Sequence, residues 1–124
     1  MYRVSAERRF WASHSLRGYR GGEDEPLHAH DWRARVSVVA EDLDAAGLAV
    51  DFHRLEEALE ALLAPFVGKS LNAVPPFDRE NPTAENLARY LYRGLRPSLA
   101  PSGVRLEAVT VWEAAGCSVT YQEP

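Results

Sequence analysis

Cysteine and lysine are nearly absent from this sequence. Cys117 is the only cysteine among 124 residues, so no disulfide can form within the chain and no cysteine-rich metal site is available. Any metal ion must therefore be held by histidine, aspartate or glutamate. Lys69 is the only lysine, and every other basic side chain belongs to an arginine.

Long apolar runs are missing as well. No stretch approaches the roughly 18 consecutive apolar residues that a membrane-spanning helix needs. Residues 1–9 carry charges where a signal peptide has its apolar core, so we expect a cytoplasmic protein without membrane contact. The formal net charge of −4 gives no reason to expect nucleic acid or an anionic membrane as a partner. A length of 124 residues with 46% hydrophobic residues fits one domain, 1–124, around one core.

Alternation of polar and apolar residues predicts four strands. Residues 2–14 and 28–40 alternate with the two-residue period of a half-buried strand. Between them, residues 17–26 are rich in glycine, acid and arginine, which predicts a loop. Residues 104–113 and 117–122 predict two closing strands joined by a tight turn. The sequence thus predicts a pair of strands near each end of the chain.

Two helices are predicted between the strand pairs. Asp51 is suited to cap a first helix, and Gly68 is predicted to end it. Thr83 is suited to cap a second helix, which Pro97 is predicted to break. The apolar stripes of the two helices recur at helical spacing: Leu55, Leu59, Leu62 and Phe66, then Leu87, Leu91 and Leu95. The order β-β-α-α-β-β indicates an α+β fold in which an antiparallel four-stranded sheet carries both helices on one face.

Three of the four histidines fall together on the predicted strands. His14 ends the inward face of the first strand, while His28 and His30 begin the inward face of the second. In an antiparallel hairpin these ends lie side by side, so the three imidazoles can converge on one ion and leave a fourth position open, as in a catalytic zinc site. The alternative from spacing alone is three partly buried, hydrogen-bonded rings. We interpret His53, in the first turn of a predicted helix, as a surface or packing residue.

Six segments give the sequence a recognisable pattern. They are, in chain order, FWASHSL at 10–16, HAH at 28–30, GLAVDF at 47–52, SLN at 70–72, NPTAENLA at 81–88 and VWE at 111–113. These resemble the motifs F-x-A-A-H-x-L, H-G-H, G-M-V-x-D-F, x-L-N, N-P-T-x-E-N-x-A and V-x-E of the 6-pyruvoyl and 6-carboxy tetrahydropterin synthase family. The resemblance spans nearly the whole chain and follows the layout predicted above.

The resemblance implies a fold, a cofactor and a substrate. The implied architecture is the tunnelling fold, in which three subunits close their sheets into a barrel and two trimers commonly stack into a hexamer. Zinc is implied at His14, His28 and His30, and Glu113 is implied to anchor the pterin ring, although it is alternatively a solvated strand-end carboxylate. The implied substrate is 7,8-dihydroneopterin triphosphate or a related reduced pterin, on a biopterin, queuosine or folate route.

The family's catalytic cysteine is not at its usual place. That place, four residues before the first histidine of H-G-H, holds Asp24, which is flanked by Glu23 and Glu25. An acidic side chain can act as a general base in place of a thiolate. Some family members use a glutamate near this position and release a 6-hydroxymethyl pterin. All three acids are therefore candidate bases, and the alternative is that they are solvated in a glycine-rich loop.

The family's Asp-His pair before x-L-N is also missing. Val67 and Gly68 stand at those positions, and neither side chain can exchange a proton. Lys69, which follows, can act as a base only if it is desolvated, and we interpret it as a surface residue. Cys117 does not match the catalytic position, and we predict that it is a small buried residue.

Three functions remain open from the sequence. A zinc-dependent lyase of this family would use an acid in place of the cysteine. A zinc- and pterin-binding protein without turnover would fit the missing Asp-His pair. A metal-stabilised oligomer without a small ligand fits least well, because Glu113 is retained.

Overall fold

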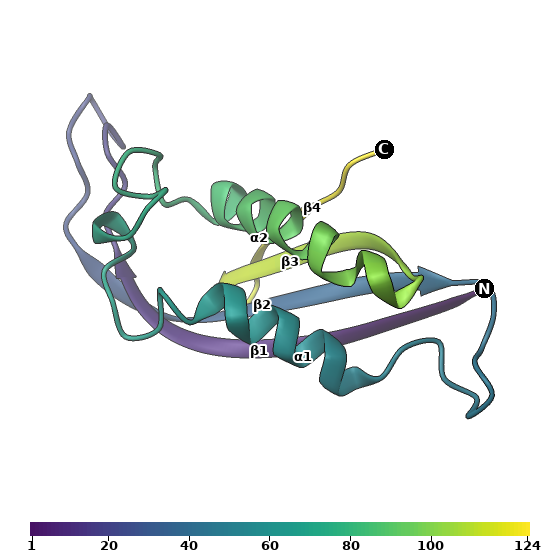
Figure 1. Cartoon of the computed structure of the whole chain (residues 1–124). Coiled ribbons are helices and arrows are strands. Elements are labelled where there is room, and N and C mark those ends of the chain that lie inside the picture. Colours follow the sequence, from purple (N-terminus) through teal and green to yellow (C-terminus); the bar gives the residue numbers. More distant parts are fainter.

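A four-stranded antiparallel sheet with two α-helices across one face makes up the protein (Figure 1). The computed structural model describes residues 1–124. Its elements are β1 (Tyr2–His14), β2 (His28–Ala40), α1 (Phe52–Leu63), α2 (Ala84–Leu99), β3 (Arg105–Ala114) and β4 (Cys117–Tyr121), with two short 3₁₀ helices, η1 (Leu71–Ala73) and η2 (Ala100–Ser102). This order confirms the predicted β-β-α-α-β-β layout.

β1 and β2 pair along their whole length without a change of register. The pairing runs from Tyr2 opposite Ala40 to His14 opposite His28. The strand order in the sheet is β1-β2-β3-β4, and every neighbouring pair is antiparallel. Because the register of β1 and β2 is unbroken over 13 residues, their alternating side chains keep to the same faces as far as the strand ends.

The core lies between the sheet and the two helices. Alternate residues of β2 are fully buried against the helices: Trp32, Ala34, Val36 and Val38. The helices cover them with buried leucines: Leu55, Leu59, Leu63, Leu87, Leu91, Leu95 and Leu99. Burying one such side chain stabilises the fold by about 1.5–3 kcal/mol relative to leaving it exposed. This packing fixes which face of the sheet carries the strand-end histidines.

α1 ends at Leu63, earlier than the predicted end at Gly68. The reason is Pro65, which has no backbone N–H to continue the helical ladder, so Ala64 donates the last helical bond. Phe66 is nevertheless fully buried in the turn that follows. Its apolar side chain extends the helical pattern of the sequence beyond the helix itself.

Pro97 does not break α2, contrary to the prediction. The helix runs through it to Leu99 and continues directly into η2. Because Pro97 lies in the last turn, it removes a single ladder bond, and Ala100 N–H still donates to the Arg96 carbonyl. Leu95 and Leu99, on either side of the proline, are buried and hold this last turn against the core.

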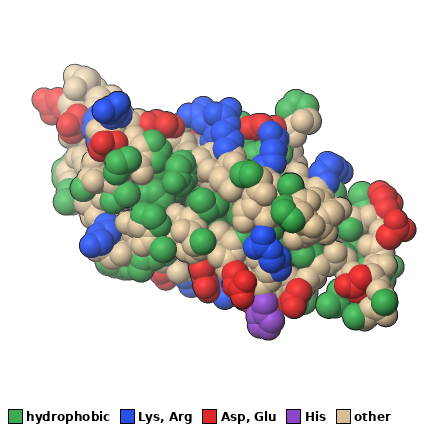
Figure 2. All heavy atoms as spheres, viewed as in Figure 1, with side chains coloured by type: hydrophobic (Ala, Val, Ile, Leu, Met, Phe, Trp, Pro, Cys, Tyr) green, Lys and Arg blue, Asp and Glu red, His purple; other side chains and the backbone are tan.

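The surface carries both signs of charge. Figure 2 shows acidic and basic side chains interspersed over the face seen in Figure 1. Several are paired, and Arg8 bridges Glu56 and Glu60, which ties β1 to α1. No helix has the length and apolar composition that crossing a bilayer requires.

The contact between Arg8 and Glu56 is expected to make stability sensitive to acid. A hydrogen bond from Arg8 at 2.7 Å lowers the pKa of the Glu56 carboxyl group. A carboxyl group with a depressed folded pKa adds stability above its unfolded pKa and loses it as the pH falls through the folded value. We expect Glu56→Gln to lower Tm at pH 7, and we expect this deficit to disappear at a pH below the depressed folded pKa of Glu56, where the wild-type carboxyl group is protonated too. Thermal melts followed by circular dichroism check this, and an equal deficit at both pH values would contradict it.

Candidate metal centre and active site

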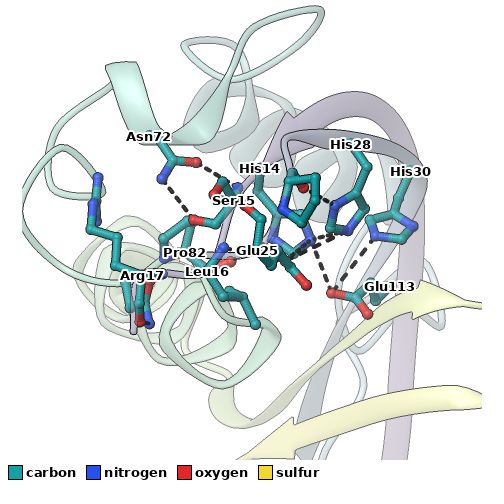
Figure 3. A network of polar contacts seen from close by, with 12 residues as sticks. His14, Ser15, Leu16, Arg17, Glu25, His28, His30, Asn72, Pro82 and Glu113 are labelled. Carbon is teal, nitrogen blue, oxygen red and sulfur yellow. Dashed lines mark hydrogen bonds and ion pairs between the residues drawn. The ribbon is translucent and has the colours of Figure 1, made fainter. Parts of the chain in front are cut away.

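The side chains of His14, His28 and His30 converge at one end of the β1–β2 pair (Figure 3). One ligand nitrogen from each ring lies within 4.8 Å of the others. The Nε2 atoms of His14 and His28 are 3.2 Å apart. The strand register produces this convergence, because His14 pairs with His28 and Ala12 pairs with His30. The three histidines thus lie together, as the strand pattern predicted.

Backbone carbonyls fix the tautomers of two of the rings. His14 Nδ1 lies 2.8 Å from the Pro82 carbonyl oxygen, and His28 Nδ1 lies 2.8 Å from that of Pro26. Because a carbonyl only accepts hydrogen bonds, we assign the proton to each Nδ1, which leaves a lone pair on each Nε2 of the neutral rings. Two lone pairs that face each other at 3.2 Å repel, and a cation between them removes the repulsion.

His30 adds a third nitrogen, which has no hydrogen-bond partner. Its Nε2 atom is buried and makes no hydrogen bond. Burial lowers the pKa of His30, which favours the neutral ring that binds metal ions. The indole of Trp32 lies edge-on to the rings of His14 and His30, at centroid distances of 4.9 and 5.4 Å. Three imidazole nitrogens beside an apolar wall fit Zn²⁺, which accepts nitrogen ligands and leaves a fourth position open in catalytic sites.

Two carboxylates border the three histidines (Figure 3). Glu113 Oε1 lies 3.3 Å from His14 Nε2 and 3.9 Å from His30 Nε2. Glu25 Oε1 lies 3.9 Å from His14 Nε2 and 3.7 Å from His28 Nε2. The Glu25 side chain is only 16% exposed, against 35% for Glu113, so Glu25 is the more shielded from water. The site therefore combines three imidazole nitrogens that could hold a metal ion with two carboxyl groups.

β3 brings Glu113 to the histidines. Val109 and Val111 are buried on the helix-covered face, and Glu113 follows them with the same two-residue period. The register between β3 and β4 shifts between Trp112 and Ala114, so Glu113 lies at a β-bulge. Bulges beside active sites commonly re-aim a side chain, and here the carboxylate reaches His14.

Of the three candidate acids, Glu25 is the one that reaches the histidines. Asp24 instead accepts a hydrogen bond from Gly18 N–H at 3.0 Å through Oδ1, so its side chain stabilises the loop. Glu23 is exposed and pairs through its backbone within the same loop. The geometry thus favours Glu25, three residues before His28, over the residue that aligns with the family's cysteine.

A pocket of about 480 Å³ opens beside the histidines. Its lining comes from the loop after β1, the start of α2 and the β3–β4 hairpin, and includes Tyr19, Glu25, His28, Thr83, Glu85, Glu113 and Cys117. Cys117, predicted to be buried, is exposed, because it begins β4 directly after the hairpin turn rather than facing the core. A second hollow of about 500 Å³, around Val39, Asp44 and Arg105, lies towards the opposite end of the sheet and contains no histidine.

The segment in place of the family's Asp-His pair lies along the edge of β1. Gly68 N–H donates to the Trp11 carbonyl at 2.6 Å, and Ser13 N–H donates to the Lys69 carbonyl at 3.0 Å. Val67 is 51% exposed, and neither it nor the next two residues line the pocket beside the histidines. These positions contribute backbone to the edge of the sheet and no side chain to the pocket beside the histidines.

The carbonyls that orient two of the histidines are not apparent from the sequence pattern. Pro26 stands two residues before His28, and Pro82 belongs to the segment NPTAENLA. Both positions are therefore noticeable in the sequence, but neither indicates a contact with a histidine ring. The signal from Pro82 suggests the start of a helix, whereas its carbonyl also accepts the Nδ1–H of His14. A role carried by a backbone carbonyl becomes visible only once the fold brings the two segments together.

The fold and the site together define a small α+β protein with a candidate three-histidine metal centre at one end of its sheet. The family profile of 6-pyruvoyl tetrahydropterin synthase matches residues 3–124. The chain therefore belongs to the 6-pyruvoyl tetrahydropterin synthase family.

Several characterised proteins are similar to this chain. The dihydroneopterin monophosphate aldolase of Pyrococcus furiosus is 30% identical over 91 residues, which cover 73% of this chain and 74% of that enzyme. The 6-carboxy-5,6,7,8-tetrahydropterin synthase of Aquifex aeolicus is 26% identical over 153 residues, covering 98% and 94% of the two chains. The structure of the Caenorhabditis elegans 6-pyruvoyl tetrahydropterin synthase matches with a TM-score of 0.82 at 22% identity, covering 100% and 98%. These three similar proteins carry different named activities.

Proposed function

We propose that this protein is a zinc-dependent lyase that cleaves the side chain of a 7,8-dihydroneopterin by an aldol-type reaction. Membership of the family supports action on a reduced pterin. The observation that carries the proposal is the position of Glu25 Oε1, 3.9 and 3.7 Å from the Nε2 atoms of His14 and His28. The similarity to an enzyme named as an aldolase supports cleavage of a carbon–carbon bond.

His14, His28 and His30 would hold the zinc ion through their Nε2 atoms. Zinc bound there supplies Lewis-acid polarisation of the hydroxyl oxygens on the pterin side chain. The chain's own contribution is to present two of the rings in the tautomer that binds metal, because the Pro82 and Pro26 carbonyls accept their Nδ1–H groups.

Glu113 is suited to anchor the pterin ring. An ionised carboxylate accepts two parallel hydrogen bonds, which matches the N–H groups on the guanidine-like edge of a pterin. Glu113 Oε1 also lies 3.3 Å from His14 Nε2, so a ring held by this carboxylate has its side chain close to the histidines. Glu113 would therefore orient the substrate, while a different group moves the proton.

Glu25 is suited to act as the general base. It would take the proton of the 2′-hydroxyl group as the C1′–C2′ bond breaks, and the bonding electron pair would pass to C1′, where the conjugated ring stabilises it. The same proton then goes to C1′. The products are 6-hydroxymethyl-7,8-dihydropterin and a two-carbon aldehyde, so the reaction balances without an oxidant, a reductant or a second substrate.

A product assay tests the proposal. The zinc-loaded protein is incubated with 7,8-dihydroneopterin and with its monophosphate and triphosphate, and the pterin products are identified by mass spectrometry. We expect 6-hydroxymethyl-7,8-dihydropterin, and we expect its formation to stop when the metal is chelated. A 6-pyruvoyl or 6-carboxy product would assign the protein to another reaction of the family, and unchanged substrate with one zinc per chain would contradict the lyase.

The charge of the pocket predicts a preference among these substrates. Glu25, Glu85 and Glu113 line the pocket, and no lysine or arginine does. One guanidinium, that of Arg20, lies 5.2 Å from the ring centroid of Tyr19, which is a lining residue. A triphosphate would place several negative charges near three carboxylates, so we expect kcat/KM for the monophosphate to exceed that for the triphosphate by about tenfold or more. Steady-state assays with both substrates check this, and the reverse order would contradict it.

A zinc- and pterin-binding protein without turnover is the second candidate. It is favoured by Val67 and Gly68, which cannot transfer protons and lie at the positions of the family's Asp-His pair. This function predicts that zinc and a reduced pterin each bind at one per chain and that no product forms. The product assay therefore separates the two candidates.

A further inference from the structure

We propose that Asn72 and Ser15 form a positioning clasp that fixes the carboxylate of Glu25 relative to the three histidines. The inference rests on the proposed role of Glu25 as the base. Neither Asn72 nor Ser15 lines the pocket beside the histidines, so both would act through Glu25 rather than on the substrate.

Asn72 holds the backbone directly after His14. Ser15 N–H donates to Asn72 Oδ1 at 2.9 Å, and Asn72 Nδ2 donates to the Ser15 carbonyl at 2.8 Å. One amide side chain thus satisfies both backbone groups of a residue that follows the end of β1. Asn72 belongs to η1, and Figure 3 shows its side chain directed at Ser15 from the side away from His28 and His30.

Ser15 and Leu16 hold Glu25 at three points. Ser15 Oγ donates to the Glu25 carbonyl at 2.5 Å, and Glu25 N–H donates to the Leu16 carbonyl at 2.9 Å. Leu16 N–H donates to Glu25 Oε1 at 3.2 Å. The same Oε1 atom lies 3.7 Å from His28 Nε2, so the clasp ends on the atom that faces the metal-binding nitrogens.

Glu25 needs this support because its loop contains no helix or strand of its own. Residues 17–27 lie between β1 and β2, and three glycines precede Glu25 with positive φ: Gly18, Gly21 and Gly22. A carboxylate on such a backbone has many accessible positions, and misplacing a reacting group by about 1 Å can cost on the order of 10² in rate. The clasp would select the one position beside the histidines.

Asn81 makes the same pair of bonds two residues further along. Arg17 N–H donates to Asn81 Oδ1 at 2.8 Å, and Asn81 Nδ2 donates to the Arg17 carbonyl at 3.0 Å. Asn86 in turn donates to the Asn81 carbonyl at 2.9 Å. The backbone between His14 and the glycine-rich loop is thus held by two asparagines, and of the two residues that they hold, Ser15 bonds to Glu25 and Arg17 does not.

Ser15→Thr and Ser15→Val test the clasp. Threonine and valine have nearly the same shape, but threonine keeps the hydroxyl group that donates to the Glu25 carbonyl, whereas valine has a methyl group in its place. We expect Ser15→Thr to keep kcat near the wild-type value. We expect Ser15→Val to lose about tenfold to 100-fold in kcat, with KM and zinc content unchanged, because the ring anchor and the metal ligands are intact. Equal kcat in the two variants, or a loss confined to KM, would overturn the proposal.

Amide hydrogen exchange measures the clasp without turnover, so it separates this inference from the proposed function. In Asn72→Ala, we expect the amides of both Ser15 and Leu16 to exchange at least about tenfold faster than in the wild type, because Leu16 N–H is held through Glu25. Faster exchange at Ser15 alone would overturn the clasp. If Asn72→Ala does not fold, Ser15→Val must show the faster exchange at Leu16. If the Ser15 and Leu16 amides exchange as expected but the wild-type protein forms no pterin product, the clasp is supported and the lyase is refuted.

Discussion

Replacing His14 with alanine is expected to abolish zinc binding and turnover together. His14 is fully buried, and its Nε2 atom lies 3.2 Å from His28 Nε2 and 3.3 Å from Glu113 Oε1, so it stands at the centre of the cluster. Removing one of three protein ligands is expected to weaken zinc binding by more than about 100-fold, since loss of outer partners alone costs 10- to 100-fold. Metal content and product formation, measured on the same samples, check both losses.

His53→Ala is the matched control for this experiment. His53 is the remaining histidine, its side chain is 84% exposed, and its contact is with Glu56 on α1. We expect zinc content and rate to stay at the wild-type level. Zinc should also raise Tm of the wild type and of His53→Ala but not of His14→Ala, because a ligand that binds only the folded state stabilises it. Full zinc retention by His14→Ala would contradict the histidine site.

Glu25→Gln is expected to lower kcat by about 10²–10⁴-fold while zinc content and pterin affinity stay unchanged. Glutamine keeps the shape of the side chain, and its amide oxygen can still accept the Leu16 N–H bond that the carboxylate accepts at 3.2 Å. It cannot take up a proton at neutral pH, so the chemical step alone is affected. Single-turnover rates, a zinc determination and a binding titration with an oxidised pterin check the three parts of this result.

Asp24→Asn and Glu23→Gln are the controls for the choice among the three acids. The Asp24 carboxylate accepts a bond from Gly18 N–H, which an asparagine oxygen can also accept, and Glu23 is exposed. We expect each variant to retain kcat within about threefold of the wild type, because surface substitutions away from the site have small effects. A loss in Asp24→Asn as large as that in Glu25→Gln would move the base to the position of the family's cysteine.

The paired strands and their histidines could be predicted because strand parity is a strong constraint. A two-residue period places His28 and His30 on the same face as Trp32, and the unbroken register sets His14 opposite His28. A slip of one residue would have turned all the inward side chains to the other face, so the pattern of apolar residues also fixes the face that carries the candidate metal ligands. This part of the site follows from the core.

The choice of Glu25 over Asp24 could not be predicted in this way. Both lie in a glycine-rich loop without periodicity, and their directions depend on single hydrogen bonds to Leu16 and Gly18. The exposure of Cys117 likewise depends on where the last hairpin turns. Alternation does not encode such positions, because they are set by backbone contacts between segments that are distant in sequence.

The end of α1 was mispredicted for a related reason. Phe66 is buried as the helical stripe requires, but Pro65 ends the ladder before it, so the apolar pattern continues on a turn. At Pro97 the opposite holds, and packing of Leu95 and Leu99 keeps the helix intact through a proline. In both places the apolar side chains are buried as their spacing predicts. Backbone hydrogen bonding determines whether they lie on a helix or on a turn.

The most direct test of carbon–carbon cleavage is to measure the two-carbon fragment. The zinc-loaded protein is given 7,8-dihydroneopterin monophosphate, the aldehyde is trapped, and the trapped product is counted against the pterin product. The proposed reaction predicts one glycolaldehyde phosphate for each 6-hydroxymethyl-7,8-dihydropterin, and neither product in the chelated sample. Release of inorganic phosphate with a three-carbon side chain still on the pterin would contradict it, because that outcome requires elimination rather than cleavage between C1′ and C2′.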